Sequence, residues 1–124
     1  MDKKLYTVKE VCEKYSVTRK TLFYYDRINL IKPYSRQGVQ QHKMYTEDEL
    51  KLLDRVLLLR KCGLRIAEIV DFVRNSDTAR QKALLLKVLE RLQKEMSDKA
   101  SRIDCLKTLI LDIEQKGYDE NEGK

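Results

Sequence analysis

The feature that most constrains this fold is a stripe of apolar residues in the last third of the chain. Its members follow one another at steps of three, four or seven residues, which places them on one face of an α-helix for about four heptads. They are Leu85, Leu89, Leu92, Met96, Ile103, Leu106, Ile110 and Ile113. Ser76 and Asp77 are suited to cap this helix, and we expect it to run to about Lys116, with Gly117 as its stop.

Such a helix is too long to be buried by the rest of so small a chain. About 35 residues at 1.5 Å each give a rod of roughly 50 Å. The stripe therefore predicts a coiled coil with a second copy of the chain. Lys99, in the middle of the stripe, is expected to set the register at a cost in stability. The alternative is a helix that folds back onto its own domain.

The net charge of +6 lies in the first third of the chain. Residues 1–45 contain ten basic and four acidic residues, whereas residues 46–76 contain six of each and residues 77–124 contain ten of each. A basic end on an otherwise neutral chain indicates a polyanionic partner, most often nucleic acid. The alternative is a charge that serves solubility alone.

Length and composition argue against several other classes. A chain of 124 residues is too short for a doubly wound or barrel enzyme, and it shows no nucleophile with its base and no phosphate loop, so we expect no enzyme. No apolar run is long enough to span a membrane and no export signal opens the sequence, so we expect a cytoplasmic protein. Cys12, Cys62, Cys105 and the single His42 form no ligand cluster, so we expect neither metal nor cofactor.

Two short helices are predicted near the N-terminus. A capping box of Thr7 and Glu10 opens a helix over about 8–14, and Thr18 caps a second helix over about 19–28. Two such helices joined by a short turn constitute a helix-turn-helix, whose second helix presents its first residues to DNA base edges. The side chains of that segment whose chemistry suits bases and phosphates are Thr18, Arg19, Lys20, Thr21 and Tyr24.

A basic hairpin over about 30–45 follows, with an extended segment starting at Leu30 and a return strand at 43–45. It carries Lys32, Arg36 and Lys43, and beside a helix-turn-helix it would act as a wing that contacts the DNA backbone; the alternative is a solvated loop.

Taken over the whole chain, the expected fold is mainly α. We predict helices over about 47–61 and 66–75, a winged helix-turn-helix head in 1–75, a coiled-coil helix in 76–116 and a disordered tail in 117–124.

Several segments occur in a characteristic order along the chain. They are Tyr6-Thr7-Val8 with Glu10-Val11 after it, Ser16-Val17-Thr18, Thr21-Leu22-Phe23-Tyr24-Tyr25-Asp26-Arg27 with Leu30-Ile31 after it, Tyr45-Thr46-Glu47-Asp48-Glu49-Leu50, and Leu59-Arg60-Lys61-Cys62-Gly63-Leu64 with Glu68-Ile69 after it. Together they resemble the MerR family of bacterial transcription regulators. The resemblance covers about residues 5–75, and the long terminal helix suits the family's architecture. It implies a short member of the family without a separate effector domain.

The resemblance also implies a homodimer whose long helices pair antiparallel and whose heads bind a pseudo-palindrome in double-stranded promoter DNA. Many members of the family bend and untwist the promoter so that RNA polymerase can engage it, which is deformation work on DNA. Carried over by position, the DNA-binding residues would be Thr18, Arg19, Tyr24, Arg27, Arg36 and Lys43, with Arg60 or Lys61 near a second wing.

The sequence departs from the family pattern at three places. Phe23 stands where the family usually has arginine, Gln41-His42-Lys43-Met44-Tyr45 replaces Gly-Tyr-Arg-x-Tyr, and Arg65 replaces a Ser or Thr that caps the fourth helix. Two alternatives to a transcription regulator therefore stay open. One is an architectural or recombination accessory protein with the same head, and the other is a coiled-coil interaction module that has lost DNA binding.

Overall fold

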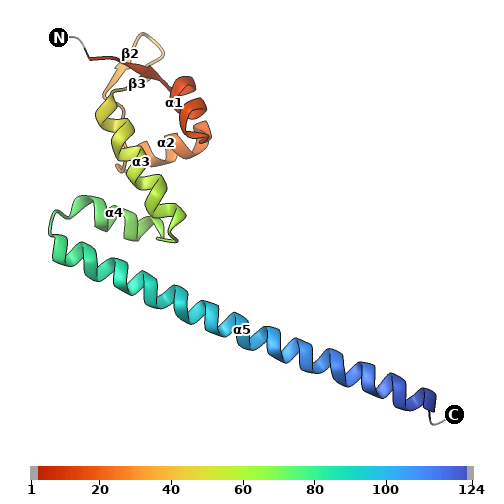
Figure 1. Ribbon diagram of the computed structural model, residues 1–124. Coiled ribbons are helices and arrows are strands. Elements are labelled where there is room, and N and C mark those ends of the chain that lie inside the picture. Colours follow the sequence, from red (N-terminus) through yellow and green to blue (C-terminus); the bar gives the residue numbers. More distant parts are fainter. Residues whose placement is uncertain (1–2, 123–124) are drawn as a thin grey trace. The chain divides into compact units, whose positions relative to one another are not determined.

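The computed structural model describes residues 3–122, with side chains described for residues 3–117. It confirms the mainly α fold. The chain divides into two compact units, Met1–Asp77 and Thr78–Lys124, and we call the first of them the head. The elements, in chain order, are β1 (Tyr6–Thr7), α1 (Val8–Tyr15), α2 (Arg19–Arg27), β2 (Ser35–Gln37), β3 (His42–Tyr45), α3 (Glu47–Lys61), α4 (Ile66–Arg74) and α5 (Thr78–Glu122) (Figure 1).

The turn between α1 and α2 is built from local hydrogen bonds. Thr7 caps α1 as predicted: its Oγ1 accepts from the N–H of Glu10 at 3.2 Å, and the Glu10 carboxylate accepts from the N–H of Thr7 at 3.0 Å. Ser16 then adopts the left-handed conformation at φ 55°, and the N–H of Val17 donates to the carbonyl of Cys12 at 3.2 Å. These features end α1, because the left-handed residue turns the chain out of the helix and the last carbonyls find hydrogen-bond donors. The second helix, α2, then begins after Thr18.

Strands β1, β3 and β2 lie in that order in a small antiparallel sheet. Thr7 pairs with Met44, and Arg36 pairs with Lys43. The turn of the β2–β3 hairpin, which is the wing, contains Gly38 at φ 78° and Gln41 at φ 55°. β1 is too short to carry an alternating pattern, so it has no sequence signal of its own.

The expectation of an extended segment from Leu30 is wrong, because the strand begins later. The N–H groups of Leu30 and Ile31 both donate to the carbonyl of Tyr25, at 2.9 and 3.1 Å. They therefore complete the C-terminal end of α2, and their side chains are buried. Only at Ser35 does the chain become a strand.

The core of the head lies between the helix-turn-helix, the sheet, α3 and α4. The inner face of α3 contributes four side chains at helical spacing, and each is almost wholly buried: Leu50, Leu53, Val56 and Leu59. Burial of this kind is the main favourable term in the folding of a domain this small. The largest fully buried side chains are Tyr45, Leu22, Ile31, Leu50, Leu53, Leu64, Ile69, Val11 and Val56.

Helix α5 has 45 residues, which gives a length of roughly 68 Å at 1.5 Å per residue. It does not stop at Gly117 but continues to Glu122, so the predicted disordered tail is wrong for residues 117–122. A glycine inside an exposed helix costs about 1 kcal/mol relative to alanine, which weakens a helix without ending it. Residues 123–124 of that predicted tail lie outside the described residues.

Candidate nucleic-acid interface

The first turn of α2 is held by two threonines. Thr18 Oγ1 accepts from the N–H of Thr21 at 3.1 Å and donates to Thr21 Oγ1 at 3.0 Å. Both hydroxyls thus take part in the cap that starts the helix. The charged side chains at this end, Arg19 and Lys20, are exposed to solvent. The residues predicted to meet DNA bases are therefore brought together at the start of α2, with the threonines fixing the helix and the cations facing outward.

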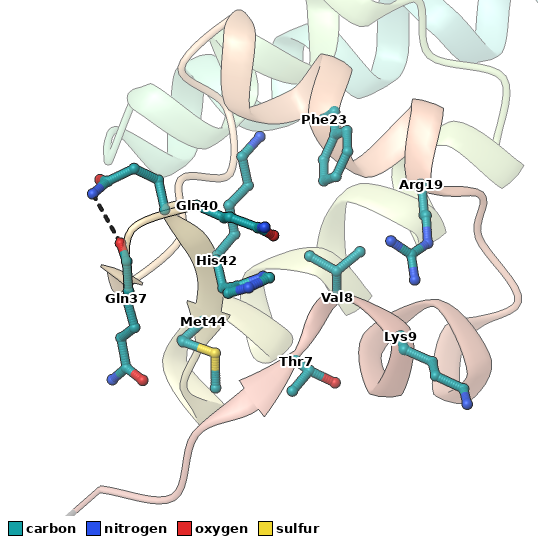
Figure 2. Close-up of a pocket in the computed structure, with 12 residues that line it drawn as sticks. Thr7, Val8, Lys9, Arg19, Phe23, Gln37, Gln40, His42 and Met44 are labelled. Atoms are coloured by element: carbon teal, nitrogen blue, oxygen red, sulfur yellow. Dashed lines mark hydrogen bonds between the residues drawn. The ribbon is translucent and has the colours of Figure 1, made fainter.

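A hollow of about 840 Å³ separates the start of α1 and α2 from the wing, and we call it the wing hollow. Figure 2 shows Arg19 and Phe23 of α2 on one side of this space, His42 and Met44 of β3 on the other, and Val8 near its middle. Its lining residues are Thr7, Val8, Lys9, Arg19, Phe23, Gln37, Gly38, Gln40, Gln41, His42, Lys43 and Met44. It combines an apolar floor with cations at its edges.

A second hollow of about 530 Å³ lies on another face of the same helix, toward α3 and α4, and we call it the helix hollow. The Arg27 guanidinium lies 5.8 Å from the centre of the Tyr24 ring, and Arg60 Nη1 donates to the carbonyl of Leu64 at 3.3 Å. The lining residues are Lys20, Thr21, Tyr24, Tyr25, Arg27, Arg60 and Ile66. Five residues predicted to bind DNA therefore share this hollow.

Two other predicted contacts, Arg36 and Lys43, have an internal partner in Asp26. Arg36 Nη2 lies 2.9 and 3.2 Å from the two carboxylate oxygens, and Lys43 Nζ lies 2.9 Å from Oδ2. Lys32 Nζ completes the group at 3.4 Å from Oδ1. Asp26 itself is 5% exposed. One buried carboxylate of α2 thus joins the connecting loop, β2 and β3.

The electrostatics of Asp26 follow from this cluster. Burial by itself would raise the pKa of the carboxyl group, since it penalises the charged form. The hydrogen bonds and charges of Lys43 and Arg36 outweigh burial and hold the pKa of Asp26 below its ordinary value. The carboxylate is therefore ionised at neutral pH.

Tyr45 lies in the core close to this cluster and is 1% exposed. Burial first, and then the charge of Asp26, raise the pKa of Tyr45 to about 12. Among the described residues, its hydroxyl and that of Ser35 are buried without a hydrogen-bond partner in the protein. Tyr45, the last residue of β3, is therefore neutral at physiological pH.

Sequence reasoning did not identify Asp26 as a site residue, because an acid within a basic segment enters only the net charge. Its position gave a usable signal: Leu22, Tyr25 and Asp26 share the inner face of α2, and all three are buried. A carboxylate where the helical pattern expects an apolar side chain requires buried cationic partners. Lys9, which borders the wing hollow, was also not selected.

The departures from the family pattern have local explanations. Phe23 packs its ring under Lys43, whose Nζ lies 3.9 Å from the ring centre, which is a cation–π contact. At the start of α4 the Glu68 carboxylate accepts from the N–H of Arg65 at 2.8 Å, so half of a capping box remains. The Arg65 side chain has no acceptor oxygen and cannot supply the other half.

Two of the residues predicted to bind DNA, Lys61 and Thr18, border neither the wing hollow nor the helix hollow. Lys61 is exposed at the end of α3.

The apolar stripe of α5 is exposed along its length. Its eight members have between 39% and 75% of their surface exposed, the extremes being Leu92 and Met96. The others are Leu85, Leu89, Ile103, Leu106, Ile110 and Ile113. In the single chain, therefore, these side chains are not buried.

Among the described residues there is neither a cluster of metal ligands nor a membrane-spanning helix. No group of three or more His, Cys, Asp or Glu side chains in that part of the chain is arranged to hold a metal ion. No helix within it is both long and apolar enough to cross a membrane.

The head has the architecture of a winged helix-turn-helix DNA-binding domain, with α1 and α2 as the helix pair and β2–β3 as the wing. The family model described as MerR HTH family regulatory protein matches residues 6–76, and the chain belongs to this family. The HTH-type transcriptional activator mta of Bacillus subtilis (strain 168) is 31% identical over 93 residues, which cover 70% of this chain and 36% of that protein. The uncharacterized HTH-type transcriptional regulator YyaN of the same organism is 30% identical over 71 residues, or 57% of this chain and 51% of that one. The chain thus spans between about a third and a half of the length of the curated relatives it matches.

Solved structures give the same assignment. The N-terminal part of the Bacillus subtilis multidrug transporter activator, MtaN, is similar with a TM-score of 0.66 and 28% identity, over 80% of this chain and 94% of that one. EcmrR, solved as an EcmrR–DNA complex in EcmrR-RPo, is similar with a TM-score of 0.69 and 26% identity, over 80% of this chain and 37% of that one. The relatives are transcription regulators, which supports the expectation that the chain is not an enzyme.

Proposed function

We propose that this chain is a dimeric, sequence-specific transcription regulator of the bacterial cytoplasm that binds and distorts a pseudo-palindrome in promoter DNA. One observation carries the proposal. The start of α2 exposes Arg19 and Lys20, and on either side of the helix lies a hollow bordered by cations. An α-helix with basic residues at its first turn fits the major groove, and a cation-lined hollow beside it fits a phosphate backbone.

Each part of the surface then has its own task. Arg19 and Lys20 reach base edges or the phosphates beside them, because long donors at the start of a recognition helix meet the groove first. Tyr24, Arg27 and Arg60 hold one DNA strand in the helix hollow. The wing hollow takes the backbone of the other strand, with Lys9 and Arg19 at its edge. Lys61 extends the second contact along α3.

The stripe of α5 pairs with the same stripe of a second copy, antiparallel, and so joins two heads. The support is its exposure: eight large apolar side chains at coiled-coil spacing, each at least 39% exposed, form a continuous face in the single chain. Lys99 lies at the midpoint between Leu85 and Ile113, so the two copies of Lys99 approach each other at the centre of such a pair.

Two connected heads on one duplex can bend it, since each head fixes the groove it enters. The regulator then acts by changing how RNA polymerase engages the promoter. EcmrR, whose DNA complex is described as part of EcmrR-RPo, supports this step by similarity.

The test begins with selection of bound duplexes from a random pool by the full-length protein. The expected result is enrichment of an inverted repeat, with affinity that falls steeply with salt, by about 0.9 in log K per unit of log salt for each phosphate neutralised. Arg19→Ala should lose the selected site. Lys116→Ala, which removes the same charge from α5, should retain it. Failure of the wild-type protein to retain any duplex at low salt would contradict the proposal.

Transcription from a promoter carrying the selected site separates regulation from architecture. A regulator changes the amount of transcript made by purified RNA polymerase, whereas an architectural protein bends the site without that change. A gel assay with the site placed at different positions along a fragment measures the bend. Binding and bending without any effect on transcription would favour the architectural alternative.

A further inference from the structure

The Asp26 cluster pairs three cations of the head with one buried carboxylate. Lys32, Arg36 and Lys43 come from the connecting loop, β2 and β3, and each has a terminal nitrogen within 3.4 Å of one carboxylate. The carboxylate side chain is 7% exposed, while the side chains of Lys43, Arg36 and Lys32 are 21%, 39% and 56% exposed. The charged ends of all three side chains lie beside α2, and Lys43 is the most enclosed of them.

The register of the sheet explains why an acid is needed here. Arg36 and Lys43 are directly opposite each other on neighbouring strands. Like charges in that position repel and destabilise the pair. Asp26 accepts hydrogen bonds from both, so it removes the repulsion and joins the hairpin to α2. Phe23 provides a second support, because its ring lies 3.9 Å from Lys43 Nζ.

We propose that Asp26 is a specificity-determining residue, which withholds Lys32, Arg36 and Lys43 from the DNA backbone and fixes the wing against the recognition helix. This inference rests on the proposed function. Arg36 and Lys43, two of the residues expected to bind DNA directly, then act on DNA through the position of the wing. Phosphate contacts raise affinity for every sequence alike, so cations held internally lower non-specific binding. A fixed wing meets the backbone only where α2 sits correctly in its groove.

The consequence is that loss of Asp26 should affect two kinds of DNA in opposite directions. Asp26→Asn releases cations, so binding to an unrelated duplex should become tighter and more dependent on salt, with a slope steeper by about 0.9 for each cation that reaches a phosphate. Binding to the selected site should become weaker, because the wing is no longer anchored. Glu13→Gln is the matched control, since Glu13 is an exposed acid of α1 and its loss changes the net charge equally.

The experiment measures affinity for the selected site and for an unrelated duplex of equal length across a salt series, using the full-length protein. The expected result is a ratio of specific to non-specific affinity at least tenfold lower in Asp26→Asn, with Glu13→Gln close to the wild type. Asp26→Glu, which keeps the charge, should recover part of the ratio. Equal behaviour of Asp26→Asn and Glu13→Gln would overturn the inference.

A second variant keeps the test valid if Asp26→Asn folds poorly. Lys43→Met, with Asp26 retained, should leave the slope of log K against log salt unchanged for the unrelated duplex. The reason is that Lys43 is already paired with Asp26 and does not contact a phosphate. A slope shallower by about 0.9 would show that Lys43 contacts a phosphate, and it would overturn the inference. If the wild-type protein binds neither duplex, the proposed function itself fails, and this inference with it. If the wild type binds but Asp26→Asn behaves like Glu13→Gln, or Lys43→Met lowers the salt slope, only the inference fails.

Discussion

The head buries its large apolar side chains among its own elements, whereas α5 exposes a stripe of them along its length. Leu53 and Ile69 are no more than 1% exposed, but Ile103 and Ile110 of α5 are 51% and 54% exposed. The head therefore contains the partners that its core needs. The stripe of α5 lacks them within the single chain, so its stability should depend on a second copy and hence on concentration.

The largest effect should come from breaking the stripe. Ile103→Asp places a charge in the middle of the paired face and should abolish the dimer while the head stays folded. Because the second head then no longer binds at high effective concentration, affinity for a two-half-site DNA should fall by about 10²- to 10⁴-fold.

Sedimentation and gel retardation measure these two effects. Ser101→Asp is the control, since it adds the same charge two residues away, about 200° around the helix. A dimer that survives Ile103→Asp as it survives Ser101→Asp would contradict the proposed pairing.

Leu53→Ala tests the opposite side of the comparison. It removes a fully buried side chain of α3 and leaves a cavity, which should lower the free energy of unfolding by about 2–5 kcal/mol. Urea unfolding measures this loss. It should be the same at low and high protein concentration, whereas the loss caused by Ile110→Ala should grow as the protein is diluted. A concentration dependence for Leu53→Ala would show that the head too needs a partner.

An alkaline loss of stability should be confined to the head, whose core holds Tyr45. The pKa of Tyr45 is about 12 in the folded chain against about 10 for an unfolded tyrosine, so the neutral form is favoured by folding. Its contribution is fully present below pH 10 and is lost as pH rises from 10 to 12, by about 2–3 kcal/mol in all.

Unfolding at pH 8.5 and at pH 11, compared between the wild type and Tyr45→Phe, isolates this contribution, because the two proteins are otherwise identical. The wild type should lose more stability than the variant across this interval. Equal losses in the two proteins would mean that Tyr45 ionises without penalty.

The smallest effect concerns the start of α4. Arg65 has the extended backbone of a helix cap, with φ −76° and ψ 158°, but its side chain cannot accept a hydrogen bond. Arg65→Ser should supply the missing acceptor and stabilise the head by about 0.5–1 kcal/mol, measured by thermal unfolding. Arg65→Ala, which removes the same charge without adding an acceptor, is the control.

Most helices of this chain could be predicted from the sequence because their signals are local. Capping residues such as Thr7, Thr18 and Thr46 mark helix starts, and all three are caps in the structure. The wing was less well predicted, because the segment at Leu30 has extended character but uses its N–H groups to end α2. The end of α5 was misplaced because Gly117 weakens a helix without ending it.

The Asp26 cluster could not be derived from spacing. Asp26 and Lys43 are 17 residues apart in the sequence, and only the return of the hairpin over α2 brings their charges within 2.9 Å. Local propensity describes neighbours within a turn or a strand pair. Which acid pairs with which base depends on tertiary packing, so the internal role of two expected DNA contacts appears only in three dimensions.

Thr7 belongs to two elements at once, and this has a kinetic consequence. It is the last residue of β1, paired with Met44 of the wing strand, and it is also the cap that accepts from the N–H of Glu10. When the sheet edge at Thr7 opens, the first turn of α1 therefore loses its cap, and the Glu10 amide is exposed. Hydrogen exchange at the Glu10 amide and at the β3 amides should follow one shared opening event. Any condition that slows the opening of the wing should therefore lower both exchange rates together.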